Sequence, residues 1–260
     1  MESIDVTGGF ELEDRVIIIT GAGQGIGRSF AHAFAAAGAV AVVADLNAEN
    51  GESVVEEISN SGGQAVSIQT NIGDEQSTLA LADAVEQRYG RIDGLINNAG
   101  IFSTITMRPF MEIPLEEWND VMHVNVTGVF LMSRAVTPTM KRQGFGRIIN
   151  ISSAAVTMGR PGYLHYIASK SALLGMSRSM ARELGEHGIT VNSLLPGATE
   201  TEIDRATVTE AQKRAMLAMR CVSRAETPDD LVGTAMFLAS PASGFLTGQS
   251  LTVDGGLTHL

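Results

Sequence analysis

Tyr166 and Lys170 are the pair of residues in this chain with the clearest capacity for chemistry. A spacing of four residues is about one helical turn, so a phenol and an ammonium placed this way share one face of a helix. A phenol ordinarily ionises near pH ~10, but a cation beside it favours the phenolate and lowers the pKa. A group tuned in this way can remove a proton from an alcohol near neutral pH. The pair therefore predicts an acid/base site.

Two serines follow a predicted strand shortly before this pair. The apolar run from 147 to 151 predicts a strand, and Ser152 and Ser153 come directly after it. Either hydroxyl can hold an alcohol or carbonyl oxygen through a hydrogen bond. The alternative interpretation is an amphipathic helix with an incidental Tyr/Lys pair. That alternative is weakened because the chain has only three tyrosines and three lysines.

A glycine-rich turn near the start of the chain predicts a dinucleotide site. The β-branched run from Val16 to Thr20 leads directly into Gly21-Ala-Gly-Gln-Gly-Ile-Gly27, and apolar residues then recur at helical spacing until Gly38. Glycines let the backbone approach a pyrophosphate closely, and the N-terminus of the following helix offers unpaired N–H groups.

Asp45 ends the second predicted strand, which runs from 40 to 44. A carboxylate at this point can accept hydrogen bonds from both hydroxyls of an adenosine ribose. A 2′-phosphate would meet a like charge there, and Ala22, Gly23 and Gln24 in the turn supply no cation. The sequence therefore favours NAD over NADP. A structural turn followed by a surface aspartate is the alternative, but strand, turn, helix and acid all coincide.

Strands and helices continue to alternate up to the C-terminus with no linker or internal repeat. This pattern predicts one α/β domain over 12–260 with a parallel sheet, after a polar leader at 1–11. Further strands are expected at 64–69, 92–96, 189–195 and 250–253, and helices at about 75–89, 115–141, 163–186, 210–219 and 229–238. Residues 199–226 are less regular and are expected to form a lid over the site.

Two groups of asparagines stand out from this pattern. Asn97 and Asn98 precede Ala99-Gly100 at the end of a predicted strand. They can form a simple turn, but the carboxyl end of a strand in a parallel sheet also borders the ligand crevice. Asn125 is a polar exception in the apolar helix expected at 115–141.

Composition narrows the class of protein. The formal net charge of −11 disfavours nucleic-acid or anionic-membrane binding. The lone Cys221 excludes an intrachain disulfide and a cysteine-based zinc site, and it fits a reducing cytoplasm. No targeting signal or membrane span is recognisable, so we expect a cytoplasmic protein. The histidines show no ligand spacing, so no metal is expected, and His165 is interpreted as a packing or rim residue.

Large apolar side chains near the motifs are candidate walls of a substrate pocket. They suggest an apolar substrate, such as a cyclic or aryl secondary alcohol, although packing within the core is an equally good interpretation for each. The candidates are Phe102, Met107, Phe110, Met158, Tyr163, Met216, Leu217 and Met219.

The motifs together resemble those of the short-chain dehydrogenase/reductase family. The resemblance runs from about Leu12 to the end of the chain and rests on Thr20-Gly-Ala-Gly-Gln-Gly-Ile-Gly27, Asn97–Gly100, Asn125, Ser153, Tyr166-x-x-x-Lys170 and Pro196-Gly197 with Thr201. It implies a doubly wound Rossmann-type fold, with a seven-stranded parallel sheet in the order 3-2-1-4-5-6-7 and helices on both faces. It also implies hydride transfer between a secondary alcohol and a nicotinamide.

The resemblance implies a role for each motif. Tyr166 would be the acid/base, Lys170 would lower its pKa and hold the nicotinamide ribose, and Ser153, with Ser152 as fallback, would bind the substrate oxygen. Asn125 would support a water that links Lys170 to solvent. The substrate set is Ser153, Met158, Tyr163 and Tyr166. The cofactor set is Gly21, Gln24, Gly25, Ile26, Gly27, Asp45, Leu46, Asn71, Ile72, Asn98, Ala99, Gly100, Tyr166, Lys170, Pro196, Gly197, Thr199 and Thr201. Asn71 departs from the aspartate that many members carry near the adenine, which would alter the detail of binding.

Two other functions stay open at this point. A 3-oxoacyl-carrier-protein reductase would need a basic rim for its acidic partner, which residues 135–140 do not offer, and Asp45 disfavours NADP. A catalytically silent dinucleotide-binding module would be expected to lose the tyrosine, lysine or serine.

The resemblance further implies a homotetramer or homodimer paired through the helices at 115–141 and 163–186, with residues 258–260 reaching a neighbouring subunit.

Overall fold

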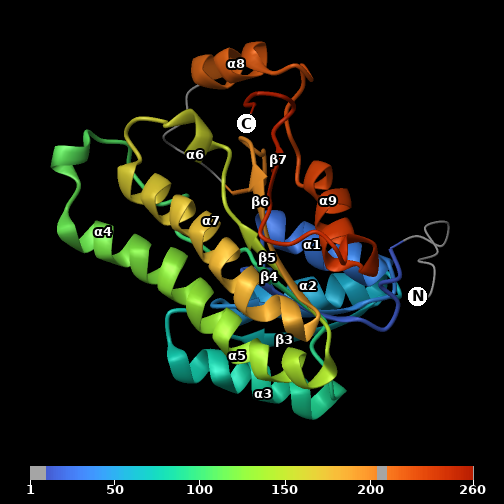
Figure 1. Ribbon diagram of the computed structural model, residues 1–260. Helices are drawn as coiled ribbons and strands as arrows, with labels where there is room; N and C mark the ends of the chain where they lie inside the picture. The colour runs from blue at the N-terminus through green and yellow to red at the C-terminus, as the bar shows by residue number, and fades with distance from the viewer. Residues whose placement is uncertain (1–9, 204–209, 260) are drawn as a thin grey trace.

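The computed structural model describes residues 10–203 and 210–259. Most of the expected leader at 1–11, part of the expected lid and residue 260 lie outside the described residues. Within the described part, seven strands form one parallel sheet in the order β3-β2-β1-β4-β5-β6-β7, which confirms the predicted topology (Figure 1). The strands are β1 (Val16–Thr20), β2 (Val40–Asp45), β3 (Gln64–Gln69), β4 (Gly94–Asn97), β5 (Gly146–Ile151), β6 (Ile189–Pro196) and β7 (Ser250–Val253).

Helices pack on both faces of this sheet. Figure 1 shows α3, α5 and α7 together on one side, with α1, α2 and α9 on the other. The α-helices are α1 (Gly25–Ala36), α2 (Ala48–Asn60), α3 (Glu75–Tyr89), α4 (Leu115–Met122), α5 (Gly128–Gln143), α6 (Ala155–Met158), α7 (Leu164–Leu184), α8 (Glu210–Met219) and α9 (Asp229–Ala239). Short 3-10 turns lie at Phe110–Glu112, Gly185–His187 and Pro241–Ser243, and a π-helical turn lies at His123–Thr127.

The two faces of the sheet carry separate apolar cores. Successive side chains of a strand point to opposite faces, so the continuous run in β1 supplies both. Ile17 and Ile19 pack with Phe30 of α1, whereas Ile18 packs with Met132 of α5. All of these side chains are fully buried. This two-sided burial is why β1 is apolar throughout and does not alternate.

The predicted strand at 92–96 starts two residues too early. Asp93 is buried, and its carboxylate accepts a hydrogen bond of 2.9 Å from the backbone N of Val16 and pairs with Arg15 and Arg91. The ladder with β1 begins only at Gly94, which pairs with Ile17. Asp93 therefore anchors the entry to β4 through its side chain.

The helix predicted at 115–141 is present, but it is not uniform. The π-helical turn divides it into α4 and α5, and Asn125 lies within that turn. Neither α2 nor the short α6 was predicted. The segment of α2 is rich in glutamate and contains Gly51, and it buries few apolar side chains, among them Val54 and Ile58. Its apolar pattern is weak because only one narrow face meets the sheet.

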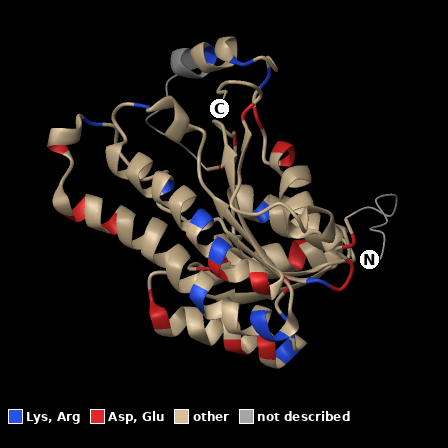
Figure 2. Ribbon diagram, in the orientation of Figure 1, with Lys and Arg blue, Asp and Glu red and all other residues tan. Residues whose placement is uncertain are grey.

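Charged residues of both signs occur along α3 and α5 (Figure 2). Arg134 pairs with Glu75 and Arg142 pairs with Glu86, and both pairs join α5 to α3. Among the described helices, none is both long enough and apolar enough to cross a membrane.

Candidate active site

A cavity of about 520 Å³ lies where the strands β1, β2, β4, β5 and β6 end. This is the edge at which open parallel sheets bind ligands. Of the catalytic, cofactor and substrate residues that the family resemblance implies, only Gly25, Gly27 and Asn125 are absent from its lining. Those that line the cavity are Gly21, Gln24, Ile26, Asp45, Leu46, Asn71, Ile72, Asn98, Ala99, Gly100, Ser153, Met158, Tyr163, Tyr166, Lys170, Pro196, Gly197, Thr199 and Thr201.

Tyr166 and Lys170 lie together in the first turns of α7, with side chains that are almost completely buried. The ammonium Nζ of Lys170 is 5.9 Å from the centre of the Tyr166 ring. It donates a hydrogen bond of 2.8 Å to the backbone carbonyl of Ile151, at the end of β5. Burial lowers the pKa of Lys170 to about 8, because a desolvated ammonium is disfavoured. The strand end thus fixes the cation beside the phenol.

The two serines after β5 have different environments. The hydroxyl of Ser152 donates a hydrogen bond of 2.8 Å to the backbone carbonyl of Lys170, so it ties β5 to α7. The hydroxyl of Ser153 accepts a bond of 3.2 Å from the backbone N of Ala155, and its own proton has no acceptor among the described residues. Ser153 therefore has a donor to offer a substrate oxygen, which favours it over Ser152.

Asn125 lies just behind the cavity wall. Its carboxamide oxygen accepts a bond of 2.7 Å from the backbone N of Ile101, and its nitrogen donates to the carbonyl of Ile101 and to the hydroxyl of Ser169. A Cβ on Gly100 would lie 3.0 Å from the Asn125 oxygen and 3.4 Å from Lys170 Nζ. The π-helical turn is the local distortion that brings this amide inward; such turns are frequent at functional sites.

The glycine turn is packed too tightly for side chains. A Cβ on Gly27 would lie 2.2 Å from the carbonyl oxygen of Gly21 and 2.6 Å from Nδ2 of Asn98. That amide nitrogen donates to the carbonyls of Thr20 and Gly21, so it holds the turn from the neighbouring strand end. Gly27 thus shapes the turn from behind, which explains why it does not line the cavity. Gly25 is covered by Ile203, whose side chain would lie 2.9 Å from a Cβ at this position.

Glu202 shows that the N-terminus of α1 can hold an anionic oxygen. Its carboxylate accepts a hydrogen bond of 2.8 Å from the backbone N of Gly25, the first residue of the helix. N–H groups and the positive dipole end at this position suit a phosphate oxygen equally well. The turn therefore fits the pyrophosphate of a dinucleotide, with Gly21, Gln24 and Ile26 lining the cavity beside it.

Asp45, the last residue of β2, contacts the same turn at Gly23. One carboxylate oxygen accepts a bond of 2.8 Å from the backbone N of Gly23, and the other accepts one of 2.9 Å from Asn47. A Cβ on Gly23 would lie 2.9 Å from the Asp45 carboxyl carbon, so only glycine permits this approach. Asn71 lines the cavity, and its side-chain oxygen accepts a bond of 3.0 Å from Gly73 N.

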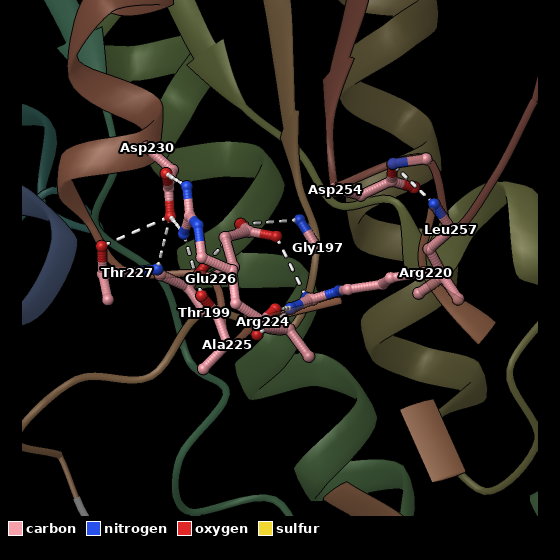
Figure 3. A network of polar contacts seen from close by, with 12 residues as sticks. Gly197, Thr199, Arg220, Arg224, Ala225, Glu226, Thr227, Asp230, Asp254 and Leu257 are labelled. Atoms are coloured by element: carbon pink, nitrogen blue, oxygen red, sulfur yellow. Dashed lines mark hydrogen bonds and ion pairs between the residues drawn. The ribbon is translucent and has the colours of Figure 1, made fainter. Parts of the chain in front are cut away.

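Sequence reasoning missed a buried ion pair behind the loop that starts at Pro196. Figure 3 shows Glu226 facing Gly197, Thr199 and Arg220. Its carboxylate accepts bonds of 3.0 Å from Gly197 N, 2.8 Å from Thr199 Oγ1 and 3.1 Å from Arg220. Both members of the ion pair are about 95% buried. Burial raises the pKa of Glu226.

This network joins the end of α8 to the cavity wall. Arg220 directly follows α8 and also donates to the carbonyl of Ala198. In the same view, Arg224 pairs with Asp230 at the start of α9, where the arginine is largely exposed (Figure 3). A charged residue at 226 in an irregular segment carried no sequence signal, because two of its partners, Gly197 and Thr199, lie 29 and 27 residues away in the chain.

Four of the eight candidate substrate walls line the cavity. Phe102, Met158, Tyr163 and Met216 line the cavity, but Met107, Phe110, Leu217 and Met219 do not. Phe110 is 65% exposed and Met219 is 57% exposed, because both lie on the outer face of short helical segments. The lining also includes Ser103 and Arg160, which are polar and were not predicted. Their signal was present, since both adjoin the predicted wall segments.

His165 is completely buried beside Tyr166, as a packing residue would be. Its Nε2 lies 2.9 Å from a carboxylate oxygen of Glu117 in α4, and the other oxygen of Glu117 pairs with Arg108. These contacts tie the start of α7 to α4. In the described part of the chain, no group of three His, Cys, Asp or Glu side chains is arranged to hold a metal ion.

The fold and the site together define a class of protein. The chain has a doubly wound parallel sheet, with a glycine-rich turn and a Tyr–Lys pair at its carboxyl edge. This combination is that of the dinucleotide-dependent oxidoreductases. The family profile described as "Enoyl-(Acyl carrier protein) reductase" matches residues 21–258. The chain is 41% identical over 249 residues to the 5-keto-D-gluconate 5-reductase of Escherichia coli (strain K12), covering 95% of this chain and 97% of that protein. It is 38% identical over 249 residues to the 3-oxoacyl-[acyl-carrier-protein] reductase of Synechocystis sp., covering 95% and 98%.

A solved structure gives the same result. A crystal structure of a putative NAD(P)-dependent gluconate 5-dehydrogenase from Beutenbergia cavernae, with bound NADP at low occupancy, matches with a TM-score of 0.90 and 35% identity. The match covers 96% of this chain and 99% of that one. The chain belongs to the short-chain dehydrogenase/reductase family. It is an oxidoreductase that acts on a CH–OH group or the corresponding ketone, with a nicotinamide dinucleotide as cofactor.

Proposed function

We propose that this protein is an NAD-dependent oxidoreductase that interconverts a secondary alcohol and its ketone, with Tyr166 as the acid/base. The observation that carries the proposal is the burial of Tyr166 and Lys170 together in the wall of the cavity, with the Ser153 hydroxyl in the same lining. A phenol held near a desolvated cation is suited to proton transfer at the reacting oxygen.

Each residue has a defined task in this proposal. Ser153 donates a hydrogen bond to the substrate oxygen, and Tyr166 takes the hydroxyl proton in oxidation or returns it in reduction. Lys170 stabilises the phenolate and binds the nicotinamide ribose. Asn125 holds the main chain of Ile101 in place and supports a water path from Lys170 to solvent. The nicotinamide, when bound, accepts or donates the hydride, so the protein's contribution is alignment and proton transfer.

Asp45 supports NAD as the preferred cofactor. Its carboxylate lines the cavity beside the glycine turn, where a 2′-phosphate would meet a like charge. The charged side chains of the lining besides Asp45 are Arg160 and Lys170, and neither belongs to the glycine turn or to the end of β2. The related crystal structure contains NADP, so the preference of this protein for NAD has to be measured directly.

The cavity walls support a substrate with an apolar body, such as a cyclic or aryl secondary alcohol. Phe102 lies against both tyrosines, with ring centres 4.4 Å from Tyr166 and 5.7 Å from Tyr163. Met158 and Met216 face the same cavity, and flexible thioether side chains adapt to irregular shapes. The described part of the proposed lid, residues 199–203 and 210–226 of the single domain at 12–260, supplies Met216 and Arg220.

Reduction of a 3-oxoacyl carrier protein is the second candidate, supported by the 38% identity to the Synechocystis reductase. Its acidic partner requires a basic surface near the cavity. On α5, Arg134 and Arg142 are paired with Glu75 and Glu86, so these cations are largely neutralised.

A silent dinucleotide-binding module is the third candidate function, and the intact Tyr166, Lys170 and Ser153 argue against it. As in the family resemblance, we propose a homotetramer or homodimer.

The test is reduction of NAD and NADP, followed at the nicotinamide absorbance, over a panel of secondary alcohols. We expect Tyr166→Phe to lower kcat by at least about a hundredfold, since general acid–base catalysis contributes roughly 10²–10⁴-fold. Tyr89→Phe is the matched control, because Tyr89 ends α3 and lies outside the cavity lining. Asp45→Asn should raise kcat/KM for NADP relative to NAD. Full activity of Tyr166→Phe would refute the mechanism, and an NADP preference in the wild type would refute the Asp45 argument.

A further inference from the structure

Arg160 is a charged residue of the cavity to which the mechanism above assigns no task. It lies in the turn between α6 and α7, flanked by Gly159 and Gly162 with positive φ angles of 58° and 83°. Its side chain lines the same cavity as Ser153 and Tyr166. The guanidinium carbon lies 5.1 Å from the centre of the Tyr163 ring, which is 2% exposed. Stacking on a buried ring holds the guanidinium at the cavity wall.

The contacts of the aromatic rings relate Arg160 to the reacting phenol. Arg160 stacks on Tyr163, Tyr163 contacts Phe102, and Phe102 contacts Tyr166. Two rings therefore intervene in the series of contacts from the guanidinium to the acid/base. A substrate whose hydroxyl reaches Tyr166 and whose other end reaches Arg160 runs along these rings.

Arg160 differs from other arginines of the chain in its ion pairing. Among the described residues, no carboxylate forms an ion pair with it, whereas Arg108, Arg220 and Arg224 each pair with one. The chain as a whole carries a net charge of −11, so acidic side chains are abundant, yet none of those in the described residues pairs with Arg160. A guanidinium that faces a cavity without a partner is suited to bind a planar anion through two parallel hydrogen bonds.

We propose that Arg160 binds an anionic group of the substrate, and that the substrate is a secondary alcohol carrying a carboxylate several carbons from the reacting carbon. This inference rests on the proposed function and deepens it by naming the substrate class. The rings of Phe102 and Tyr163 contact the body of the molecule, Ser153 and Tyr166 hold the hydroxyl, and Arg160 holds the charged end.

The test uses three probes built on the same ring: a cyclohexanol with a carboxylate on the opposite ring carbon, its neutral methyl ester, and the analogue with a phosphate monoester in place of the carboxylate. Calorimetry on the Tyr166→Phe protein with saturating NAD measures binding without turnover, so it reports on Arg160 even where no oxidation occurs. Steady-state kinetics on the active enzyme then measures kcat/KM. A charged hydrogen bond contributes about 1.5–3 kcal/mol, which corresponds to roughly 10–150-fold in affinity.

We expect Arg160→Gln to weaken binding of the carboxylate probe by at least tenfold and to leave the methyl ester within about twofold. Arg160→Lys should be intermediate, because it keeps the charge and loses the planar fork. The KM for NAD should not change. Arg88→Gln, which removes the same charge from an exposed site on α3, should affect none of the probes. Equal effects on acid and ester, or a larger effect on NAD, would overturn the proposal. Preference for the phosphate probe would reject the carboxylate as the anion.

If acid binding depends on Arg160 but no probe is oxidised by the active enzyme, the anion site stands and the proposed oxidation fails. If the ester and the acid are oxidised equally by the wild type, the proposed function stands and the anion site fails. The two ideas are therefore separable in one set of measurements.

Discussion

Removal of the charge on Glu202 should tighten NAD binding. In this structure its carboxylate accepts the hydrogen bond from Gly25 N at the start of α1, the place where the cofactor pyrophosphate is proposed to bind. The carboxylate and the pyrophosphate therefore compete for the same N–H group. Glu202→Gln keeps the size and an acceptor oxygen but removes the negative charge.

The magnitude follows from the difference between charged and neutral hydrogen bonds. A hydrogen bond to a charged group contributes about 1.5–3 kcal/mol and a neutral one about 0.5–1.5 kcal/mol. A negative charge at a helix N-terminus adds about 0.3–1 kcal/mol. Because Glu202 is exposed, we take the lower end, about 1 kcal/mol, since solvent screens such contacts. This corresponds to a dissociation constant for NAD that is about fivefold lower.

The assay is calorimetric titration of NAD at two salt concentrations. The gain in Glu202→Gln should shrink at high salt, because screening weakens the competing carboxylate. Glu200→Gln is the matched control, with the same change of charge two residues away on an exposed side chain. Weaker NAD binding in Glu202→Gln, or an equal gain in Glu200→Gln, would refute the idea of direct competition.

Two further predictions concern buried charges. Glu226→Gln leaves Arg220 buried without a charged partner, so we expect a stability loss of about 3–5 kcal/mol and a fall in Tm of roughly 6–20 °C in thermal unfolding. Arg224→Gln, which breaks the exposed pair with Asp230, should cost less than about 1 kcal/mol; similar losses in both variants would contradict the dependence on burial. Lys170 has a pKa of about 8 instead of 10.5, so between these pH values the unfolded chain binds more protons than the folded one and stability rises with pH. The urea unfolding free energy of wild type minus that of Lys170→Met should therefore increase by up to about 1.4 kcal/mol per pH unit in this window, and a flat difference curve would show that Lys170 is not desolvated.

The parts of the fold that were predictable are those with strong local signals. The helix at 75–89 was predicted with its observed ends, because Asp74 caps its first turn and Gly90 follows with a left-handed φ of 71°. The strands β1 and β3 were also predicted with their observed limits. The π-helical turn at Asn125 has no such local signal, since it arises from bonds to Ile101 and Ser169, which are distant in the chain.

The residues of the candidate site also fall into those that the sequence predicts and those that it does not. Tyr166, Lys170 and Asp45 were found because their spacing or position carries a chemical meaning by itself. Glu226 and Arg160 were missed because their significance depends on what they face, or do not face, in three dimensions. Their environments are properties of the packed loops and cannot be read from neighbouring residues.

The walls of the cavity extend from Gly21 to Leu257, nearly the full length of the chain, and this has a consequence for how the protein is made. At about 5–20 residues per second, a ribosome needs roughly 12–47 seconds to synthesise the 237 residues from Gly21 to Leu257. The glycine turn and Asp45 emerge early in that interval, whereas β7, which pairs with β6 at the edge of the described sheet, is made near its end. A nascent or prematurely released chain therefore carries the nucleotide-binding half, an open edge at β6 and no complete active site, so such fragments are prone to associate through that edge.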